Sequence, residues 1–270
     1  PPVPKIFHGR ESELEEVVGL LKQDSPRISI LGPGGVGKTS LALAALHHDE
    51  VVIKYSQRYF VSCNSCLTCA DLIAAISSHV GFTQVKSSRG IHRHFVCSEA
   101  SFLVLDNLET TWEPKRSRSE VEQFLSLLAD VPQLALLITM RGTEKPAHVK
   151  WTRPFPHPLK PLSDFAAFQM FVDIADDHHD RDSVQELLNL TSNLPLAVSL
   201  IANVVAYEGC DRTLSRWIKE RTHILSDGYD QKSNLDISIM LSYSSSRMTS
   251  GAQELLSLLS LLPDGLSDAE

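Results

Sequence analysis

The apolar residues in the first part of the chain form short continuous runs, separated by stretches in which apolar positions recur every three or four residues. Residues 28–31, 101–106 and 134–139 are apolar at most positions, which is typical of strands buried on both faces of a parallel sheet. Residues 58–61 form a fourth run, and residues 156–159 are a candidate edge strand. This pattern predicts an α/β fold, with a parallel five-stranded sheet flanked by helices.

Helices are expected between these strands, at residues 40–46, within 82–97, and wherever a capping-box pair precedes an apolar face. Such pairs mark three expected helix starts: Ser12 with Glu15, Thr68 with Asp71, and Ser119 with Glu122. The basic run at residues 115–118 is expected to be a solvated loop.

The pattern changes near residue 160. Residues 151–161 contain four prolines and exclude a regular helix. From residue 163 onward nearly every segment has helical spacing. Helices are expected at residues 164–175, 184–190, 196–207, 214–225, 235–242 and 252–262. We therefore expect an α/β domain at 1–160, a helical subdomain at 161–232 and the beginning of a further subdomain at 233–270.

The stretch from Gly32 to Thr39, G-P-G-G-V-G-K-T, matches the phosphate-binding loop pattern G-x-x-x-x-G-K-[ST] at every required position. It lies between an expected strand and an expected helix, which is the context that the pattern requires. Glycines let backbone N–H groups face phosphate oxygens, and the helix N-terminus adds its dipole. Lys38 would then contact the β- and γ-phosphates, and the Thr39 hydroxyl would bind Mg²⁺. The motif predicts a P-loop NTPase.

Two other strand ends offer groups that phosphate chemistry uses. Asp106 ends an apolar run, where a carboxylate can hold Mg²⁺ and its waters. The next residue, Asn107, cannot accept a proton, and Glu109 is the first carboxylate after it. Hydrolysis is therefore expected to be slow, or to depend on Glu109 or on a partner. Arg141 follows the strand at 134–139, where it can contact a γ-phosphate.

Two clusters of metal-binding residue types have simpler explanations. Cys63, Cys66 and Cys69 have C-x2-C-x2-C spacing, and Cys97 or His79 could complete a zinc or iron–sulfur site. No fourth ligand stands at a diagnostic spacing, so ordinary thiols are favoured. Residues 176–180, Asp-Asp-His-His-Asp, are expected to form a polar turn rather than a metal site.

Composition narrows the class of protein. The 270 residues are 43% hydrophobic and 21% charged, as in globular proteins, and the formal net charge of -8 disfavours nucleic-acid and membrane-surface binding. No apolar run approaches the roughly 18 residues that span a bilayer, and no signal-peptide pattern is present. Five cysteines, an odd number, favour a reducing cytoplasm. The missing initial Met, and an end just after an apolar helix, suggest a fragment of a longer protein.

Several short stretches occur in one order, and the set is more specific than the phosphate loop alone. They are G-R-E at 9–11, the loop at 32–39, F-V-S-C at 60–63, L-V-L-D at 103–106, T-M-R at 139–141, P-L at 161–162 and L-P-L-A at 194–197. The set resembles the NB-ARC type of STAND NTPase, the switch module of NOD-like and apoptotic receptors, and looks closest to its fungal members. The resemblance runs from about Phe7 to the end of the chain.

The resemblance implies a role for each matching residue. Gly9 and Arg10 would lie over the adenine and ribose, Arg141 would sense the γ-phosphate, and Pro195 would pack on the base. The implied nucleotide contacts are Phe7, Gly9, Arg10, Gly34, Gly35, Val36, Gly37, Lys38, Thr39, Ser40, Arg141, Leu162, Pro195 and Leu196. Thr39 and Asp106 would bind Mg²⁺, while Lys38, Asp106 and Arg141, with Glu109 as a further candidate, would act on the phosphates.

The chain departs from this family at two motifs. The acidic pair common in the family is Asp106-Asn107 here, and the family's Gly-Leu-Pro is Asn193-Leu194-Pro195, where Asn also tolerates a left-handed backbone. Residues 233–264 would open a winged-helix subdomain, whose later ADP-binding histidine would lie beyond residue 270.

The resemblance implies a molecular switch in a cytoplasmic signalling protein of innate immunity. ADP would hold the two parts closed, and ATP would favour an open form that self-associates. An N-terminal effector and C-terminal sensor repeats are expected outside this fragment, with no membrane partner. Three rivals stay open: a turnover ATPase with Glu109 as its base, a STAND-type DNA-binding regulator, and a scaffold that holds nucleotide permanently.

Overall fold

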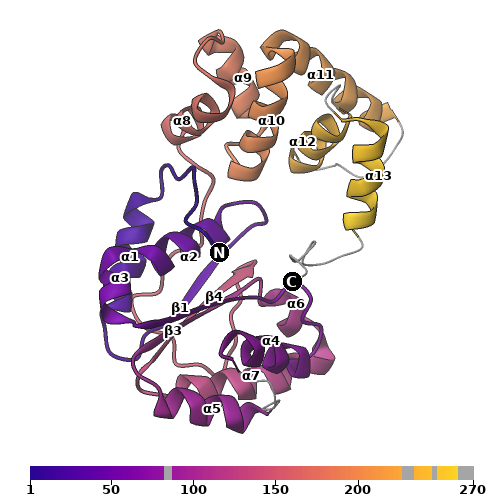
Figure 1. Cartoon of the computed structure of the whole chain (residues 1–270). Coiled ribbons are helices and arrows are strands. Elements are labelled where there is room, and N and C mark those ends of the chain that lie inside the picture. Colours follow the sequence, from indigo (N-terminus) through magenta and orange to yellow (C-terminus); the bar gives the residue numbers. More distant parts are fainter. Residues whose placement is uncertain (82–86, 227–233, 245–247, 261–270) are drawn as a thin grey trace.

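The computed structural model describes residues 1–81, 87–226, 234–244 and 248–260 (Figure 1). An α/β part, below in this view, is joined to an all-helical part above it. The α/β part contains α1 (Glu11–Leu21), β1 (Arg27–Gly32), α2 (Lys38–His47), α3 (Asp49–Lys54), β2 (Gln57–Ser62), α4 (Cys69–His79), α5 (Ser88–Cys97), β3 (Ser101–Asp106), α6 (Glu109–Trp112), α7 (Lys115–Ala129) and β4 (Leu134–Arg141). The helical part contains α8 (Asp164–Ala175), α9 (Arg181–Leu190), α10 (Pro195–Glu208), α11 (Cys210–Ser226), α12 (Asn234–Tyr243) and α13 (Ser250–Leu259).

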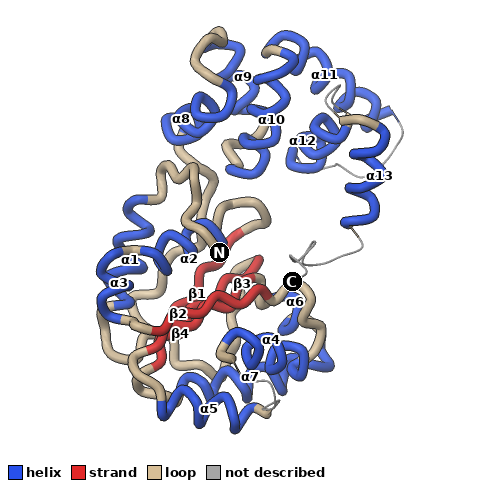
Figure 2. Tube along the Cα trace, viewed as in Figure 1, coloured by secondary structure: helices blue, strands red, loops and turns tan. Residues whose placement is uncertain are grey.

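The four strands of the sheet, red in Figure 2, run parallel in the order β1-β4-β3-β2. Their register aligns the carboxyl ends. At these ends, Gly32 of β1 pairs with Arg141 of β4, and Asp106 of β3 pairs with Ser62 of β2. The phosphate loop, Asp106 and Arg141 therefore meet at one edge of the sheet, where ligands bind in open α/β folds.

Both faces of the sheet are buried, which explains the continuous apolar runs. Ile28, Phe102 and Val104 belong to a core shared with α1 and α2, whereas Leu103 and Leu136 belong to a second core shared with α4, α5 and α7. Successive side chains of a strand point to opposite faces of the sheet, so each strand needs apolar side chains at both odd and even positions. The predicted P-loop α/β fold is confirmed.

The fifth strand position is only partly filled. Residues 152–159 run beside β1, where the Thr152 N–H donates to the Arg27 carbonyl (2.9 Å) and the Leu159 N–H to the Leu31 carbonyl (2.8 Å). Pro154, Pro156 and Pro158 lie between them and have no N–H to donate, so a regular ladder cannot form. The described residues thus form a four-stranded sheet bordered by an extended segment.

Two of the three predicted capping boxes are wrong. Thr68 and Asp71 form theirs. The first helix, however, begins at Glu11 with Arg10 as its N-cap, and the Ser12 hydroxyl instead donates to Glu13. The helix predicted after Ser119 begins earlier, at Lys115, and its N-cap is Pro114. Neither N-cap uses its side chain, so a search for capping pairs misses both starts.

The basic run at 115–118 is therefore the first turn of α7, not a loop. Arg118 stacks over the Trp112 ring, with its Cζ 3.8 Å from the ring centroid, and its guanidinium lies 3.6 Å from Glu122. The indole of Trp112 in turn donates to Glu122 (3.0 Å). These contacts hold Arg118 on α6, whereas Lys115 and Arg116 are exposed.

The helical part has its own core, in which Phe171, Leu187, Ile201 and Trp217 are buried. Its helices lie close to the predicted ranges, and α8 has the predicted bounds. The expected boundary at residues 232–233, and the last residues of the helix predicted at 252–262, lie outside the described residues. Within the described residues, no helix has the length and apolar character that crossing a membrane requires.

Candidate functional site

The phosphate loop has the backbone geometry of an anion-binding nest. Gly35 and Gly37 have positive φ angles of 73° and 96°, which glycine adopts without strain. In the described part of the chain, the backbone N–H groups of residues 35–39 have no acceptor within the protein. Such free donors at the start of α2 form a cradle suited to an anion.

Lys38, the first residue of α2, is buried beside this cradle. Its Nζ donates to the carbonyls of Gly32 (3.0 Å) and Pro33 (2.9 Å). Burial lowers the pKa of Lys38, although the nearby carboxylates of Glu109 and Asp106 oppose that shift. Among the described residues, the hydrogen-bond partners of the ammonium are thus two carbonyls of the loop, which a phosphate oxygen can replace.

Asp106 is held at the end of β3 by two hydroxyl groups. The Thr39 hydroxyl reaches both of its carboxylate oxygens, at 2.9 and 3.0 Å, and the Thr139 hydroxyl donates to Oδ1 at 2.6 Å. Burial raises the pKa of Asp106, while those hydrogen bonds and the Lys38 charge lower it. Thr39 and Asp106 are the hard oxygen donors that suit Mg²⁺.

Asn107, directly after Asp106, has left-handed backbone (φ 57°), and its Nδ2 donates a hydrogen bond to Asn64 Oδ1 (2.7 Å). Its N–H donates to the Thr139 hydroxyl (2.9 Å). A network of amides and hydroxyls therefore fixes the end of β3, and it places no second carboxylate at position 107.

Arg141, the last residue of β4, lies over the phosphate loop and forms an ion pair with Glu109. Its Cζ is 3.7 Å from the position that a Cβ on Gly34 would take. The distance from Arg141 Nε to Glu109 Oε1 is 3.3 Å. The guanidinium is mostly exposed, whereas the Glu109 side chain is only 9% exposed.

The first turn of α10 closes directly over the loop. The Leu196 N–H donates to the Gly35 carbonyl (3.1 Å), and the Leu196 Cβ is 3.0 Å from where a Cβ on Gly35 would lie. The Pro195 Cγ is likewise 4.0 Å from where a Cβ on Gly37 would lie. Asn193, just before this turn, has φ 52°, the left-handed conformation that Asn tolerates.

The N-terminal segment holds the loop from the other side. The buried Arg10 side chain donates to the carbonyls of Val36 (3.1 Å) and Lys160 (2.5 Å), so it joins the phosphate loop to the segment that leads into the helical part. Gly9 packs against Ala166 of α8, and Phe7 is half-buried against the core of the α/β part.

Between these elements lies a cavity of about 360 Å³. Its lining residues are Gly34, Gly35, Gly37, Lys38, Thr39, Ser40, Asn107, Arg141, Met170, Pro195, Leu196 and Ser199. Most of the residues proposed from the sequence are therefore brought together. The remaining proposed residues are not among its lining residues: Phe7, Gly9, Arg10, Val36, Leu162, Asp106 and Glu109.

Sequence reasoning missed Thr139, Met170 and Ser199. Ser199 lies four residues after Pro195 on α10, so helical spacing could have placed it on the same face. Met170 bears the same relation to Ala166 on α8. Thr139 stands in the sequence as the end of an apolar strand and the first residue of the T-M-R stretch, and its hydroxyl contact to Asp106 depends on strand register.

A larger cavity, of about 910 Å³, lies away from this site. It is lined by Gln57, Ser87, Arg89, Gly90, Arg93, His94, Cys97, Ser98 and Glu99. Gln57 begins β2, so this cavity is at the amino edge of the sheet, opposite the phosphate loop. Its lining includes neither the phosphate loop nor Asp106 or Arg141.

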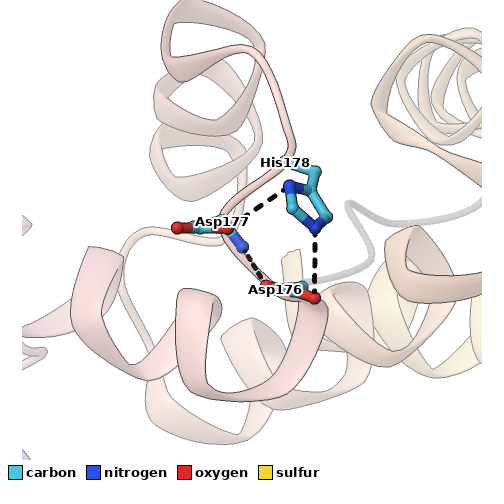
Figure 3. Close-up of side chains that lie close together, drawn as sticks. All are labelled: Asp176, Asp177 and His178. Atoms are coloured by element: carbon cyan, nitrogen blue, oxygen red, sulfur yellow. Dashed lines mark hydrogen bonds and ion pairs between the residues drawn. The ribbon is translucent and has the colours of Figure 1, made fainter.

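The two candidate metal clusters differ in the structure. Asp176, Asp177 and His178 gather at the turn after α8, where His178 lies 3.6 Å from Asp176 and 3.4 Å from Asp177 (Figure 3). All three are exposed and pair with one another, as in a polar turn. Cys63, Cys66 and Cys69 are buried free thiols, and their sulfur atoms are not among the clustered ligand atoms of the described residues.

The site fits a nucleoside phosphate with Mg²⁺ by the chemistry of its donors. Free backbone N–H groups and Lys38 suit phosphate oxygens, and the paired Thr39 and Asp106 oxygens suit the metal. Arg141 adds a second cation at the same edge. The residues present therefore match the group that the loop motif implies.

The sequence matches the family model described as Novel STAND NTPase 1 over residues 3–156. No curated protein sequence matches the chain. Among solved structures, the Walker-type ATPase paby2304 of Pyrococcus abyssi has a TM-score of 0.62 at 16% identity, covering 82% of this chain and 74% of that one.

Two further structures are similar. The Aeropyrum pernix ORC1 protein, solved in complex with DNA, has a TM-score of 0.62 at 15% identity and covers 99% of this chain and 81% of that one. DnaA of Aquifex aeolicus, bound to AMPPCP, has a TM-score of 0.53 at 13% identity and covers 88% and 79%. At such identities these likenesses show a shared fold alone. The family model, in contrast, covers more than half of the chain, including the phosphate loop, Asp106 and Arg141, and the chain therefore belongs to the Novel STAND NTPase 1 family.

Proposed function

We propose that this chain is the adenine-nucleotide switch of a STAND signalling protein, of the NB-ARC type that fungal NOD-like receptors use in innate immunity. Family membership and the ordered motifs from residue 9 to residue 197 support this assignment. The proposed ligands are ADP and ATP with Mg²⁺. AMPPCP, bound by the structurally similar DnaA, is an ATP analogue and agrees with that choice.

The observation that carries the proposal is the contact between the phosphate loop and α10. The Leu196 N–H is bonded to the carbonyl of Gly35, inside the loop itself. Any adjustment of the loop around a phosphate changes this contact, so a ligand in the loop is coupled to the position of the helical part. A ligand shifts such a balance only by its differential affinity for the two arrangements.

Each charged side chain has a proposed part in this coupling. Lys38 exchanges the Gly32 and Pro33 carbonyls for phosphate oxygens, and Thr39 and Asp106 hold Mg²⁺. ATP, when bound, supplies a third phosphate charge that ADP lacks. In this proposal, Arg141 binds that third phosphate, and this binding destabilises the closed arrangement in which the two parts pack together.

The free energies are of the right order. Reversing a 1:99 equilibrium takes about 5.5 kcal/mol of differential binding. Hydrogen bonds to charged groups contribute roughly 1.5–3 kcal/mol each, so a few contacts made only to the third phosphate are sufficient.

Thermal unfolding with ADP and Mg²⁺ tests the site. At a ligand concentration about a hundredfold above Kd, binding adds about 2.7 kcal/mol to the free energy of unfolding. We expect this stabilisation in the wild type and its loss in Lys38→Ala. Lys150→Ala, at an exposed lysine, is the matched control and should keep it. No shift in the wild type, or an equal shift in Lys38→Ala, would overturn the proposal.

A turnover ATPase is a second candidate, because Glu109 is buried at the site and its Oε2 has no hydrogen-bond partner among the described residues. A free carboxylate oxygen can accept a proton from water, which Asn107 cannot. Sustained phosphate release that disappears in Glu109→Gln would favour this function. The switch requires only slow or partner-dependent hydrolysis.

DNA binding is a third candidate, because the similar ORC1 structure was solved in complex with DNA and spans nearly all of this chain. The net charge of -8 disfavours it. Binding to duplex DNA that weakens steeply with rising salt would support it.

The wider assembly is also part of the proposal. We assign residues 1–160 to the nucleotide-binding domain, 161–232 to an ARC-like helical subdomain and 233–270 to the beginning of a winged-helix subdomain. The full-length protein would carry an N-terminal effector and C-terminal sensor repeats and would self-associate in its ATP form. Five free cysteines agree with the proposed cytoplasmic location.

A further inference from the structure

Glu109 is placed unlike an ordinary surface glutamate. It begins α6, three residues after Asp106, and its side chain is buried. Its Oε1 lies 3.3 Å from Arg141 Nε, and its Oε2 has no hydrogen-bond partner in the described part of the chain. Among the nearby charges that influence the pKa of Lys38, that of Glu109 has the largest effect, and it raises the pKa. One carboxylate therefore acts on both cations of the phosphate site.

This arrangement has an electrostatic consequence for ligand choice. A third phosphate would be bound by Lys38 and Arg141, the two cations that Glu109 already neutralises in part. A carboxylate in a partly buried site also repels an additional phosphate charge, because screening by water is reduced there. A diphosphate keeps Lys38 and the backbone N–H groups of the loop as partners but has no third phosphate for Arg141 to bind, so it experiences less of these two effects.

We infer that Glu109 is a specificity-determining residue that favours nucleoside diphosphate over triphosphate, by competing with the third phosphate for Arg141 and Lys38. The inference rests on the nucleotide switch proposed above and gives it a built-in bias toward the diphosphate form. Glu109 sets the extra binding free energy that the triphosphate must supply before Arg141 is released.

Two other roles of Glu109 predict different results when the carboxylate is removed. A general base affects hydrolysis and leaves the ratio of the two affinities unchanged. A residue that merely orients Arg141 toward the third phosphate would, when removed, weaken triphosphate binding. Only competition predicts tighter triphosphate binding after the carboxylate is removed.

Isothermal titration of the wild type, Glu109→Gln and Glu109→Met with Mg²⁺-ADP and Mg²⁺-AMPPCP tests the inference. AMPPCP resists hydrolysis, so binding is measured apart from turnover. We expect AMPPCP affinity to rise roughly tenfold in both variants, the effect of one ion pair and one like-charge repulsion, while ADP affinity changes by less than about twofold. Glu113→Gln, an exposed carboxylate at the end of α6, is the matched control and should leave both affinities unchanged.

The possible outcomes separate the two proposals. An unchanged or lower preference for AMPPCP in both variants overturns the role of Glu109 and leaves the nucleotide switch standing. Loss of ADP binding in both variants also overturns it, because a residue that discriminates the third phosphate leaves the diphosphate contacts in place. If the wild type binds neither nucleotide, the proposed function itself fails.

Discussion

At the scale of single residues, the site is a set of charges that the fold holds at a cost. Lys38, Asp106 and Glu109 are all buried, and burial shifts the pKa of Lys38 down and that of Asp106 up. Both shifts disfavour the charged form in the folded chain. A protein tolerates such groups where a ligand uses them, which agrees with a site that binds an anion and a cation together.

Asp106→Asn should reveal this cost as a dependence of stability on pH. Because the pKa of Asp106 is raised in the folded chain, the folded state binds its proton more tightly than the unfolded state. Its contribution to stability is therefore fully present below the unfolded pKa, about 3.9, and is lost as pH rises through the folded pKa. We expect the free energy of unfolding of the variant, minus that of the wild type, to increase across this window. The increase should be about 1.4 kcal/mol for each pKa unit of the shift.

Urea unfolding in EDTA, at a series of pH values, measures that difference. EDTA removes divalent ions, so metal binding does not contribute. A difference that stays flat or decreases as pH rises would contradict the account of Asp106.

At the scale of elements, the strands of the α/β part were predictable and the starts of α1 and α7 were not. Runs such as 101–106 are easily recognised, because a strand buried on both faces has no solvent-exposed face that would carry polar residues. The N-caps of α1 and α7 are Arg10 and Pro114, and neither side chain forms a capping hydrogen bond that would mark the helix start. The start of α1 is held by tertiary contacts, the Arg10 bonds to Val36 and Lys160, and local sequence does not encode those contacts.

The candidate site divides in the same way. A motif fixes the phosphate loop, and the alignment of parallel strand ends brings Asp106 and Arg141 beside it. The contact of Leu196 with Gly35 and the pairing of Arg141 with Glu109 join segments far apart in the sequence. No local periodicity predicts them.

Gly35→Ala tests whether α10 rests on the phosphate loop. Alanine is strained at φ 73°, and its Cβ would lie 3.0 Å from the Leu196 Cβ. We expect a loss of at least about 1 kcal/mol in the free energy of unfolding without nucleotide. Gly19→Ala is the matched control, because Gly19 lies inside α1 with no neighbour near its Cβ position. It should gain about 0.5–1 kcal/mol from helix propensity. Chemical denaturation of both variants decides the matter, and equal effects would argue against the contact.

At the scale of the whole molecule, the chain consists of two parts with separate cores that meet at the phosphate loop. Contacts near that junction include the Leu196–Gly35 hydrogen bond, the Arg10 bonds to Val36 and Lys160, and a hydrogen bond of 2.6 Å between the His8 ring and the Asp173 carboxylate. Separate cores allow the two parts to move as units, and in the proposed switch a ligand bound at their junction would control that movement.

Distance measurement between the two parts tests this claim most directly. Spin labels on Cys97, the exposed native thiol, and on Tyr207→Cys, at an exposed position on α10, report the separation by double electron–electron resonance. We predict one short distance with Mg²⁺-ADP and a longer or broader distribution with Mg²⁺-AMPPCP. Identical distributions with the two nucleotides, both bound to saturation, would contradict the account.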